Sequence, residues 1–222
     1  MLQQYSFDFS WLPGALPIFM QAAFLTIQIL VWSAVISLAI GLVTGQLLTS
    51  TRGWLRVPAR VYVDFFRLTP LLFQIVVVFF LIPIAFDVTL SAFTSGVIAL
   101  SLNYGAFFAE VFRAGVQSID KGQWEASQAM GIPRLRTLRR IIYPQAIRRM
   151  LPPIGSMLIS LTKDTSLISV IGVAELFNTA QNVGAGTFRQ IEVLLLVSLF
   201  YLVLNLPLAL NTERLNRKLN LA

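Results

Sequence analysis

The chain of 222 residues contains no cysteine and no histidine, and only 12% of its residues are charged. The absence of cysteine excludes a disulfide framework and any thiolate metal site. The absence of histidine removes the usual general base and the commonest metal ligand, which argues against catalysis by this chain alone. A soluble domain has roughly 25% charged residues, so the low charge content excludes an ordinary globular protein.

Hydrophobic residues instead make up 56% of the chain, and they gather in long runs with few charges. A helix that spans a membrane needs ~20 mostly apolar residues, and five segments reach that length. We therefore expect an all-α integral membrane protein with a single transmembrane domain over residues 1–222. The expected spans cover approximately residues 16–48, 68–86, 89–112, 151–174 and 193–212.

The basic residues are distributed unevenly between the two sides of these spans. The net charge of +7 does not require a nucleic-acid partner, because nearly all lysines and arginines follow span one, lie between spans three and four, or belong to the C-terminal tail. Since cytosolic loops carry an excess of lysine and arginine, we expect the N-terminus outside and the C-terminus in the cytosol. Residues 1–10 have no basic residue, so we expect span one to be retained rather than cleaved as a signal peptide.

The polar segment 114–149, between spans three and four, is expected to form a cytosolic loop that contains a short helix. Asp120 can cap this helix together with Gln123 three residues later, and Gly131 can end it. Alanines and Met130 at helical spacing form a face of small side chains that another protein can approach closely. The residues that we expect at that contact are Glu125, Ala126, Ala129 and Met130.

After Pro133, a second helix is expected to lie on the membrane surface. Its apolar stripe would face away from several arginines, as in helices that lie on an anionic cytosolic leaflet. The apolar residues are Leu135, Leu138 and Ile142, and the arginines are Arg136, Arg139 and Arg140. A simpler alternative is that the whole segment is a membrane-surface loop whose arginines only fix the orientation.

The polar segment also carries a motif with fixed spacing. Glu125-Ala126-Ser127 is followed by Gly131 after three residues, by Ile141 after nine more, and then by Tyr143-Pro144. This spacing resembles the loop by which permease subunits of bacterial ATP-binding-cassette importers dock their ATPase, whose consensus is Glu-Ala-Ala, Gly and Ile-x-Leu-Pro. Serine in place of the second alanine and tyrosine in place of leucine are mild departures. The resemblance implies an ATPase contact formed by Glu125, Ala126, Ser127, Ala129, Met130 and Gly131.

Further motifs resemble the polar-amino-acid uptake family of these permeases. They are FRLTPLL at 66–72, LSLNYGA at 100–106, AEVFR at 109–113, IDKGQWEA at 119–126 and LTKDTSL at 161–167. The family implies import of an amino acid across the inner membrane of a bacterial cell. It also implies an extracytoplasmic substrate-binding protein, a second permease subunit that is identical or homologous, and two ATPase subunits. The chain has no Gly-x-x-x-x-Gly-Lys-Ser/Thr motif, so we expect no cofactor in it, and ATP with Mg²⁺ on the ATPase.

Polar residues inside a bilayer are costly and mark substrate pathways by default. The candidates are Gln74, Asn103, Glu110, Lys163 and Asp164. Together they offer partners for both the ammonium and the carboxylate of an amino acid. Each also has a structural alternative as an ion pair or a contact between helices, for example Glu110 with Arg113. The charged residues at the outer side are expected on a solvated rim or at the binding protein, and they are Asp87, Glu175, Arg189 and Glu192.

Two rival functions stay open. One is a passive pore or membrane scaffold without energy coupling, and the motif between Glu125 and Pro144 argues against it, because neither needs an ATPase-docking loop. The other keeps the ATP-driven machinery but moves another small polar solute, or exports its cargo, and the motifs in spans three and four argue against it. The mixed polar residues suit basic, acidic and amide substrates alike, so the identity of the amino acid is not determined.

Overall fold

The computed structural model describes residues 6–220, and over this range it contains helices and turns but no strand. The expectation of an all-α chain is thereby confirmed. Residues 1–5, part of the segment expected outside the membrane, lie outside the described range. The elements are α1 (Leu12–Leu48), α2 (Gly53–Leu68), α3 (Leu71–Val76), η1 (Val77–Leu81), α4 (Ile82–Phe86), α5 (Ala92–Gln117), α6 (Lys121–Ala129), α7 (Arg134–Thr137), η2 (Leu138–Ile142), α8 (Tyr143–Asp164), η3 (Thr165–Ile171), α9 (Leu176–Thr187) and α10 (Gln190–Asn220).

The described helices provide four or five membrane spans. Four are long and apolar enough on their own, namely Leu12–Leu48, Ala92–Gln117, Arg134–Ile171 and Gln190–Leu219. A fifth exists if α2 and the segment Leu71–Phe86 cross together as one broken helix, bent by 106°. This number agrees with the five spans expected, but the broken pair takes the place of the continuous span expected over residues 68–86.

The break after α2 follows from the sequence Thr69-Pro70. A residue that precedes proline avoids the α region of backbone conformations, and Thr69 is extended, with φ −104° and ψ 147°. Pro70 is extended as well, and α3 begins at the next residue. Two short helical stretches therefore meet at a sharp corner near the middle of the molecule.

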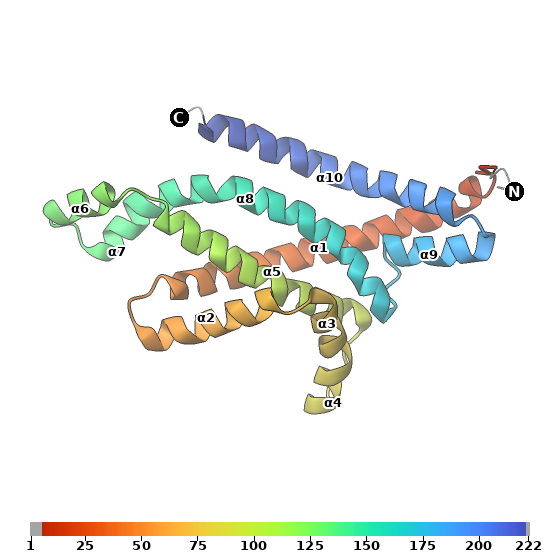
Figure 1. The fold of residues 1–222 in the computed structure, drawn as a ribbon, viewed down its shortest axis with the longest axis horizontal. Helices are drawn as coiled ribbons and strands as arrows, with labels where there is room; N and C mark the ends of the chain where they lie inside the picture. Colours follow the sequence, from red (N-terminus) through yellow and green to blue (C-terminus); the bar gives the residue numbers. More distant parts are fainter. Residues whose placement is uncertain (1–5, 221–222) are drawn as a thin grey trace, which may run out of the picture.

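The most extensive contact between two helices joins α1 to α5, which cross near the centre of Figure 1. Gly41 and Gly45 of α1 face Phe108 and Phe112 of α5. A Cβ atom at Gly41 would lie 2.4 Å from the Cβ of Phe108, and a Cβ at Gly45 would lie 2.7 Å from the Cβ of Phe112. Lipid tails are as apolar as leucine, so helices in membranes associate through such close backbone approaches between small residues.

The molecule is elongated, and its two ends carry different elements (Figure 1). Helices α6 and α7 lie at one end of the long axis, next to the turn from α1 to α2, and α10 runs toward the same end. The start of α1 and helix α9 lie at the opposite end. The described beginning and end of the chain therefore lie toward opposite ends of the long axis (Figure 1).

The helix that follows Pro133 differs from the expected surface helix. The segment from Arg134 to Ile171 is one continuous helical run, so the expected separate helix is the first part of a long one. Pro133 precedes this run, and its carbonyl accepts hydrogen bonds from the N–H groups of Arg136 at 2.8 Å and Thr137 at 3.0 Å. The π turn η2 ends just before Tyr143-Pro144. Pro144 has no N–H to donate, so it cannot continue the hydrogen-bond pattern of the preceding turn.

Glu175 directly precedes α9, and its side chain is fully buried. Its carboxylate caps α9 by accepting hydrogen bonds from the N–H groups of Phe177 at 2.9 Å and Asn178 at 2.7 Å. The hydroxyl of Tyr201 donates a third hydrogen bond, at 3.0 Å, from α10. The expectation of a solvated rim is therefore wrong for Glu175, because this buried carboxylate satisfies the N–H groups of the first turn of α9.

Glu192 is also fully buried, so the solvated rim is wrong there too. One of its oxygens accepts a hydrogen bond from the N–H of Asp8 at 3.1 Å and lies 3.6 Å from the guanidinium of Arg189. Arg189 pairs in turn with the carboxylate of Asp8 at 3.3 Å. These contacts fasten the segment before α1 to the start of α10. Of the four charges expected at the outer side, only Asp87 is exposed.

Replacing Glu175 with glutamine is expected to remove a pH-dependent contribution to stability. Burial raises the pKa of the Glu175 carboxyl above its ordinary value of 4.5, although the three hydrogen bonds to it act in the opposite direction. The folded protein then binds this proton more tightly than the unfolded chain, so the contribution is complete below pH 4.5 and is lost as pH rises through the raised pKa. The melting temperature of the variant relative to wild type should therefore increase with pH between about 4 and 8. A difference that is constant over this interval contradicts the prediction.

Candidate functional site

Helix α6 carries the spaced motif and is bounded by strong local signals. At its start the Asp120 carboxylate accepts a hydrogen bond from the N–H of Gly122 at 2.6 Å, while the N–H of Gln123 donates to the Asp120 carbonyl at 3.1 Å. The cap thus uses Gly122 rather than the expected reciprocal pair with Gln123. At its end Gly131 has φ +68°, a left-handed conformation that glycine adopts without strain. This confirms the expected stop.

Most of the residues expected at the contact are exposed on the outward face of α6. Glu125, Ala126, Ala129 and Gly131 are exposed, and Met130 is 67% exposed. Ser127 is the exception, since it is only 2% exposed and its hydroxyl donates to the Gln123 carbonyl at 2.7 Å. Ser127 therefore belongs to the inner side of the helix, where a residue of small volume is required.

The inner side of α6 is packed on the ends of α5 and α8. Trp124 joins a buried cluster that contains Phe112 and Val116 of α5 together with Ala146 and Met150 of α8. In addition, the guanidinium of Arg149 in α8 donates to the carbonyl of Ser118, just after α5. Trp124 is thus the side chain by which α6 contacts two long helices.

Two of the expected pathway residues hold the corner between α2 and α3. The side-chain amide of Asn103 donates to the Gln74 side-chain oxygen at 3.0 Å and to the Phe66 carbonyl at 2.9 Å. Gln74 donates to the hydroxyl of Thr69 at 2.7 Å. Both amides are nearly fully buried. In a membrane the backbone groups freed by a broken helix need such partners. Gln74 and Asn103 both bind carbonyl groups at the corner. Asn103 in addition lines a cavity.

A cavity of about 410 Å³ lies next to this corner. Asp164 of α8 and Arg67 of α2 both line it, so groups of opposite charge border the same space. Asp164 accepts a hydrogen bond from the hydroxyl of Tyr104 at 2.7 Å, which fixes its orientation. Lys163 is exposed and does not line this cavity. Adjacent residues on a helix point in different directions, so the structure separates the two members of the pair.

Glu110 follows Asn103 by two helical turns on α5 and forms ion pairs with three arginines. Its carboxylate is 2.7 Å from Arg60, 2.6 Å from Arg113 and 3.9 Å from Arg67. The pair with Arg113 was one of the alternatives open from the sequence, whereas the pairs with the two α2 residues join elements far apart in the chain. Glu110 also lines a second cavity, of about 510 Å³.

Arg67 lies where the two cavities meet. It lines both of them, as do Phe107 and Met157, and its guanidinium carbon is 5.5 Å from the centre of the Phe107 ring. The pathway residues expected from the sequence do not include Arg67, because the charge directly before a long apolar run indicates the boundary of a span. Its place in the FRLTPLL motif is the signal that could have identified it.

Comparisons with known proteins identify the family of the chain. Residues 37–221 match the family described as "Binding-protein-dependent transport system inner membrane component". The chain is 40% identical over 220 residues to the glutamine transport system permease protein GlnP of Escherichia coli (strain K12), covering 97% of this chain and 99% of GlnP. It is 42% identical over 205 residues to the L-cystine transport system permease protein TcyB of Bacillus subtilis (strain 168), covering 92% of this chain and 87% of TcyB.

A solved structure supports the same assignment. The crystal structure of an amino acid ABC transporter with histidines superimposes with a TM-score of 0.90 and 30% sequence identity, over 96% of this chain and 100% of that chain. Sequence and fold thus agree over nearly the whole length. The chain belongs to the family of inner membrane components of binding-protein-dependent transport systems.

Proposed function

We propose that this chain is the permease subunit of an ATP-driven amino-acid importer, and that a separate ATPase docks on α6. The observation that carries the proposal is the mechanical connection of α6. Its outward face is exposed, and its Trp124 contacts α5 and α8, the helices that line both cavities. Movement of a docked ATPase is then transmitted to the cavity walls, which is what alternating access between the two sides of the membrane requires.

The charges in the first cavity suit an amino acid as cargo. Arg67 can bind a carboxylate and Asp164 can bind an ammonium group, and hydrogen bonds between charged groups are about twice as strong as neutral ones. The volume of about 410 Å³ falls in the range of roughly 300–1,000 Å³ that is usual for small-molecule sites. The glutamine and cystine permeases and the amino acid transporter among the similar proteins support this substrate class.

The proposal includes an orientation and a set of partners. The end that carries α6, with its many arginines, faces the cytosol, and the end with α9 faces outward. A second permease subunit, identical or homologous, completes the path, and an extracytoplasmic binding protein delivers the amino acid. ATP and Mg²⁺ are bound by the two ATPase subunits. Asn103, Glu110 and Asp164 border the path, and Lys163 faces another surface.

The rival without energy coupling, a passive pore or scaffold, gives no reason for an exposed α6 anchored to two spans. The rival with another small polar solute differs only in the contents of the first cavity. Both are tested in proteoliposomes that contain this chain, its ATPase and the binding protein. ATPase activity stimulated by one class of amino acid is the expected result. An ATPase that co-purifies without such stimulation would contradict the substrate class, and an ATPase that fails to bind would contradict the docking role.

In the same assay, Asp164→Asn is expected to reduce uptake at low substrate concentration by about tenfold or more. Loss of a hydrogen bond to a charged group costs roughly 1.5–3 kcal/mol, and 1.4 kcal/mol corresponds to a factor of ten in binding. The matched control is Asp87→Asn, which makes the same chemical change at an exposed position with φ 51° that asparagine tolerates. Assembly with the ATPase should survive in both variants, and its loss in Asp164→Asn alone would indicate a structural role.

A further inference from the structure

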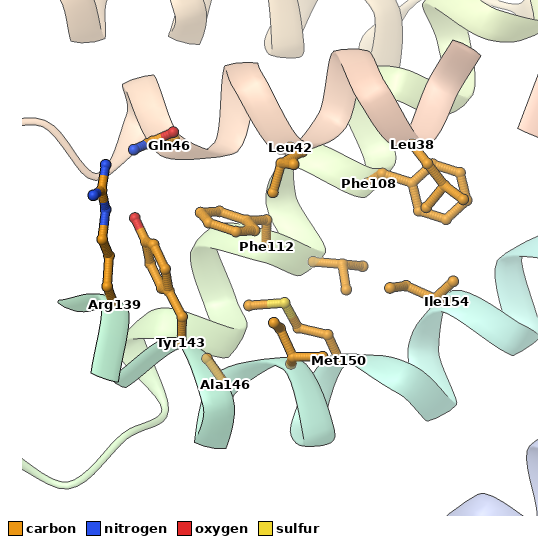
Figure 2. Close-up of a pocket in the computed structure, with 12 residues that line it drawn as sticks. Leu38, Leu42, Gln46, Phe108, Phe112, Arg139, Tyr143, Ala146, Met150 and Ile154 are labelled. Carbon is orange, nitrogen blue, oxygen red and sulfur yellow. The ribbon is translucent and has the colours of Figure 1, made fainter. Parts of the chain in front are cut away.

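A third cavity, of about 530 Å³, opens between α1 and the first half of α8 (Figure 2). Its walls are apolar over most of their length: Leu38 and Leu42 come from α1, Phe108 and Phe112 from α5, and Met150 and Ile154 from α8. Arg139, Tyr143 and Gln46 lie together at one end, while Leu38 and Ile154 lie at the other (Figure 2). The space is therefore amphipathic along its length, with a polar end and an apolar end.

This cavity and the one beside Glu110 are bordered by mostly different residues of α5. Phe108 and Phe112 line the third cavity, whereas the neighbouring Phe107 and Glu110 line the cavity that contains the three-arginine cluster. Val111 of α5 and Met150 of α8 line both spaces, so these two side chains form the wall between them. An occupant of the third cavity is thus distinct from the transported solute.

The depth of the apolar part matches one leaflet of a bilayer. From Tyr143 to Ile154 the α8 wall advances eleven residues, which at 1.5 Å per residue is roughly 16 Å. The hydrocarbon core of a bilayer is about 30 Å thick, so one leaflet contributes about half of this. A single acyl chain that enters beside Tyr143 would end near Ile154.

The polar end continues into a basic cavity. A neighbouring space of about 620 Å³ shares Gln46 and Tyr143 with the apolar one and adds Arg52 from the α1–α2 turn and Arg134 from α7. No aspartate or glutamate lines either space. Within residues 6–220, the ion pairs engage other arginines, and Arg52, Arg134 and Arg139 take part in none of them. Three guanidinium groups without an acidic partner surround the mouth of an acyl-sized groove.

We propose that this groove binds one anionic phospholipid of the cytoplasmic leaflet, with its phosphate at Arg52, Arg134 and Arg139 and one acyl chain along α8. Charge complementarity selects this occupant, because basic pockets on the cytosolic side of membrane helices bind anionic headgroups. The lipid joins the α1–α2 turn to α7, next to the α6 end of the molecule. This inference does not depend on the identity of the transported solute.

The test is native mass spectrometry of the assembled permease–ATPase complex, titrated with palmitoyl-oleoyl phosphatidylglycerol or with the zwitterionic phosphatidylcholine of the same chains. Phosphatidylglycerol is expected to remain bound and phosphatidylcholine to be lost. Arg139→Gln should weaken phosphatidylglycerol binding about fivefold, since one basic residue near a lipid surface contributes about that factor. Leu42→Trp should displace the lipid by filling the apolar part, because Leu42 is exposed and lines the groove.

Two matched controls are available on the same helices. Arg140→Gln removes an exposed charge that lines neither space, and Val43→Trp adds the same bulk at an exposed position outside the groove. Both should retain the lipid. Equal retention in all four variants, or equal binding of the two lipids, overturns the proposal. A disulfide between two copies of the Leu42→Cys variant in the assembled complex also overturns it, because the groove would then be an interface between subunits.

Discussion

Reversing the charge of Glu125, by Glu125→Lys, is expected to abolish ATP-driven uptake while leaving membrane insertion intact. Glu125 is exposed on α6 and has no ion pair among the described residues, so the isolated fold does not need it. A central interface residue costs about 2 kcal/mol or more when it is lost, which weakens binding about 30-fold. Co-purification of the ATPase and uptake in proteoliposomes measure the two effects separately.

The control for this variant is Glu213→Lys. Glu213 is exposed near the end of α10, where it pairs with Arg217 one helical turn away. Such exposed ion pairs contribute only about 0–1 kcal/mol, so the control variant should bind the ATPase and transport normally. Normal uptake by Glu125→Lys would remove the basis for α6 as the docking helix, whereas a joint failure of both variants would indicate a general effect of added positive charge.

Replacing Gly41 with valine is expected to prevent the chain from reaching its folded state. A Cβ at Gly41 would lie 2.4 Å from the Cβ of Phe108, 3.0 Å from its carbonyl carbon and 3.1 Å from the backbone nitrogen of Ala109. Two of these atoms belong to the backbone of α5 and cannot rotate away. Overpacking typically costs 1–3 kcal/mol, and we expect ~3 kcal/mol or more here because the helices would have to separate. The yield and melting temperature of detergent-purified protein report the loss.

Gly14→Val provides the comparison on the same helix. Gly14 is exposed, and no atom lies within 4 Å of the position that its Cβ would take. This variant should fold with a change in stability of about 0.5 kcal/mol or less, as is usual for surface substitutions. If Gly41→Val were equally well tolerated, the close approach of α1 to α5 could not be a determinant of the fold.

Much of α6 could be predicted from the sequence because the signals that bound it are local. Asp120 and Gly131 mark the two ends of α6, and the spacing of its small residues indicates a surface for close contact. The membrane class follows equally from composition, because a chain with few charges and long apolar runs cannot form the polar surface that a soluble fold needs. These features depend on neighbours within a few residues, so they can be recognised without the tertiary structure.

The roles of several polar residues could not be predicted, because their partners are distant in sequence. Tyr104 orients Asp164 from 60 positions away, and Arg60 reaches Glu110 from 50 positions away. The same applies to Glu175, whose burial depends on helices that pack around the start of α9. A carboxylate next to apolar residues has the same local pattern whether it caps a buried helix or faces water.

The sequence by itself determined the membrane class, the number of crossings to within one, and the helix that carries the motif, since hydropathy and local capping act over short segments. Only the tertiary structure decided that α2 and α3 meet at a corner held by Asn103, that Arg67 and Asp164 border one cavity, and that three unpaired arginines surround an apolar groove. Each of these arrangements depends on the packing of α1, α5 and α8. These helices approach closely at glycines, and such packing depends on how distant helix surfaces fit together, which no single segment of the sequence specifies.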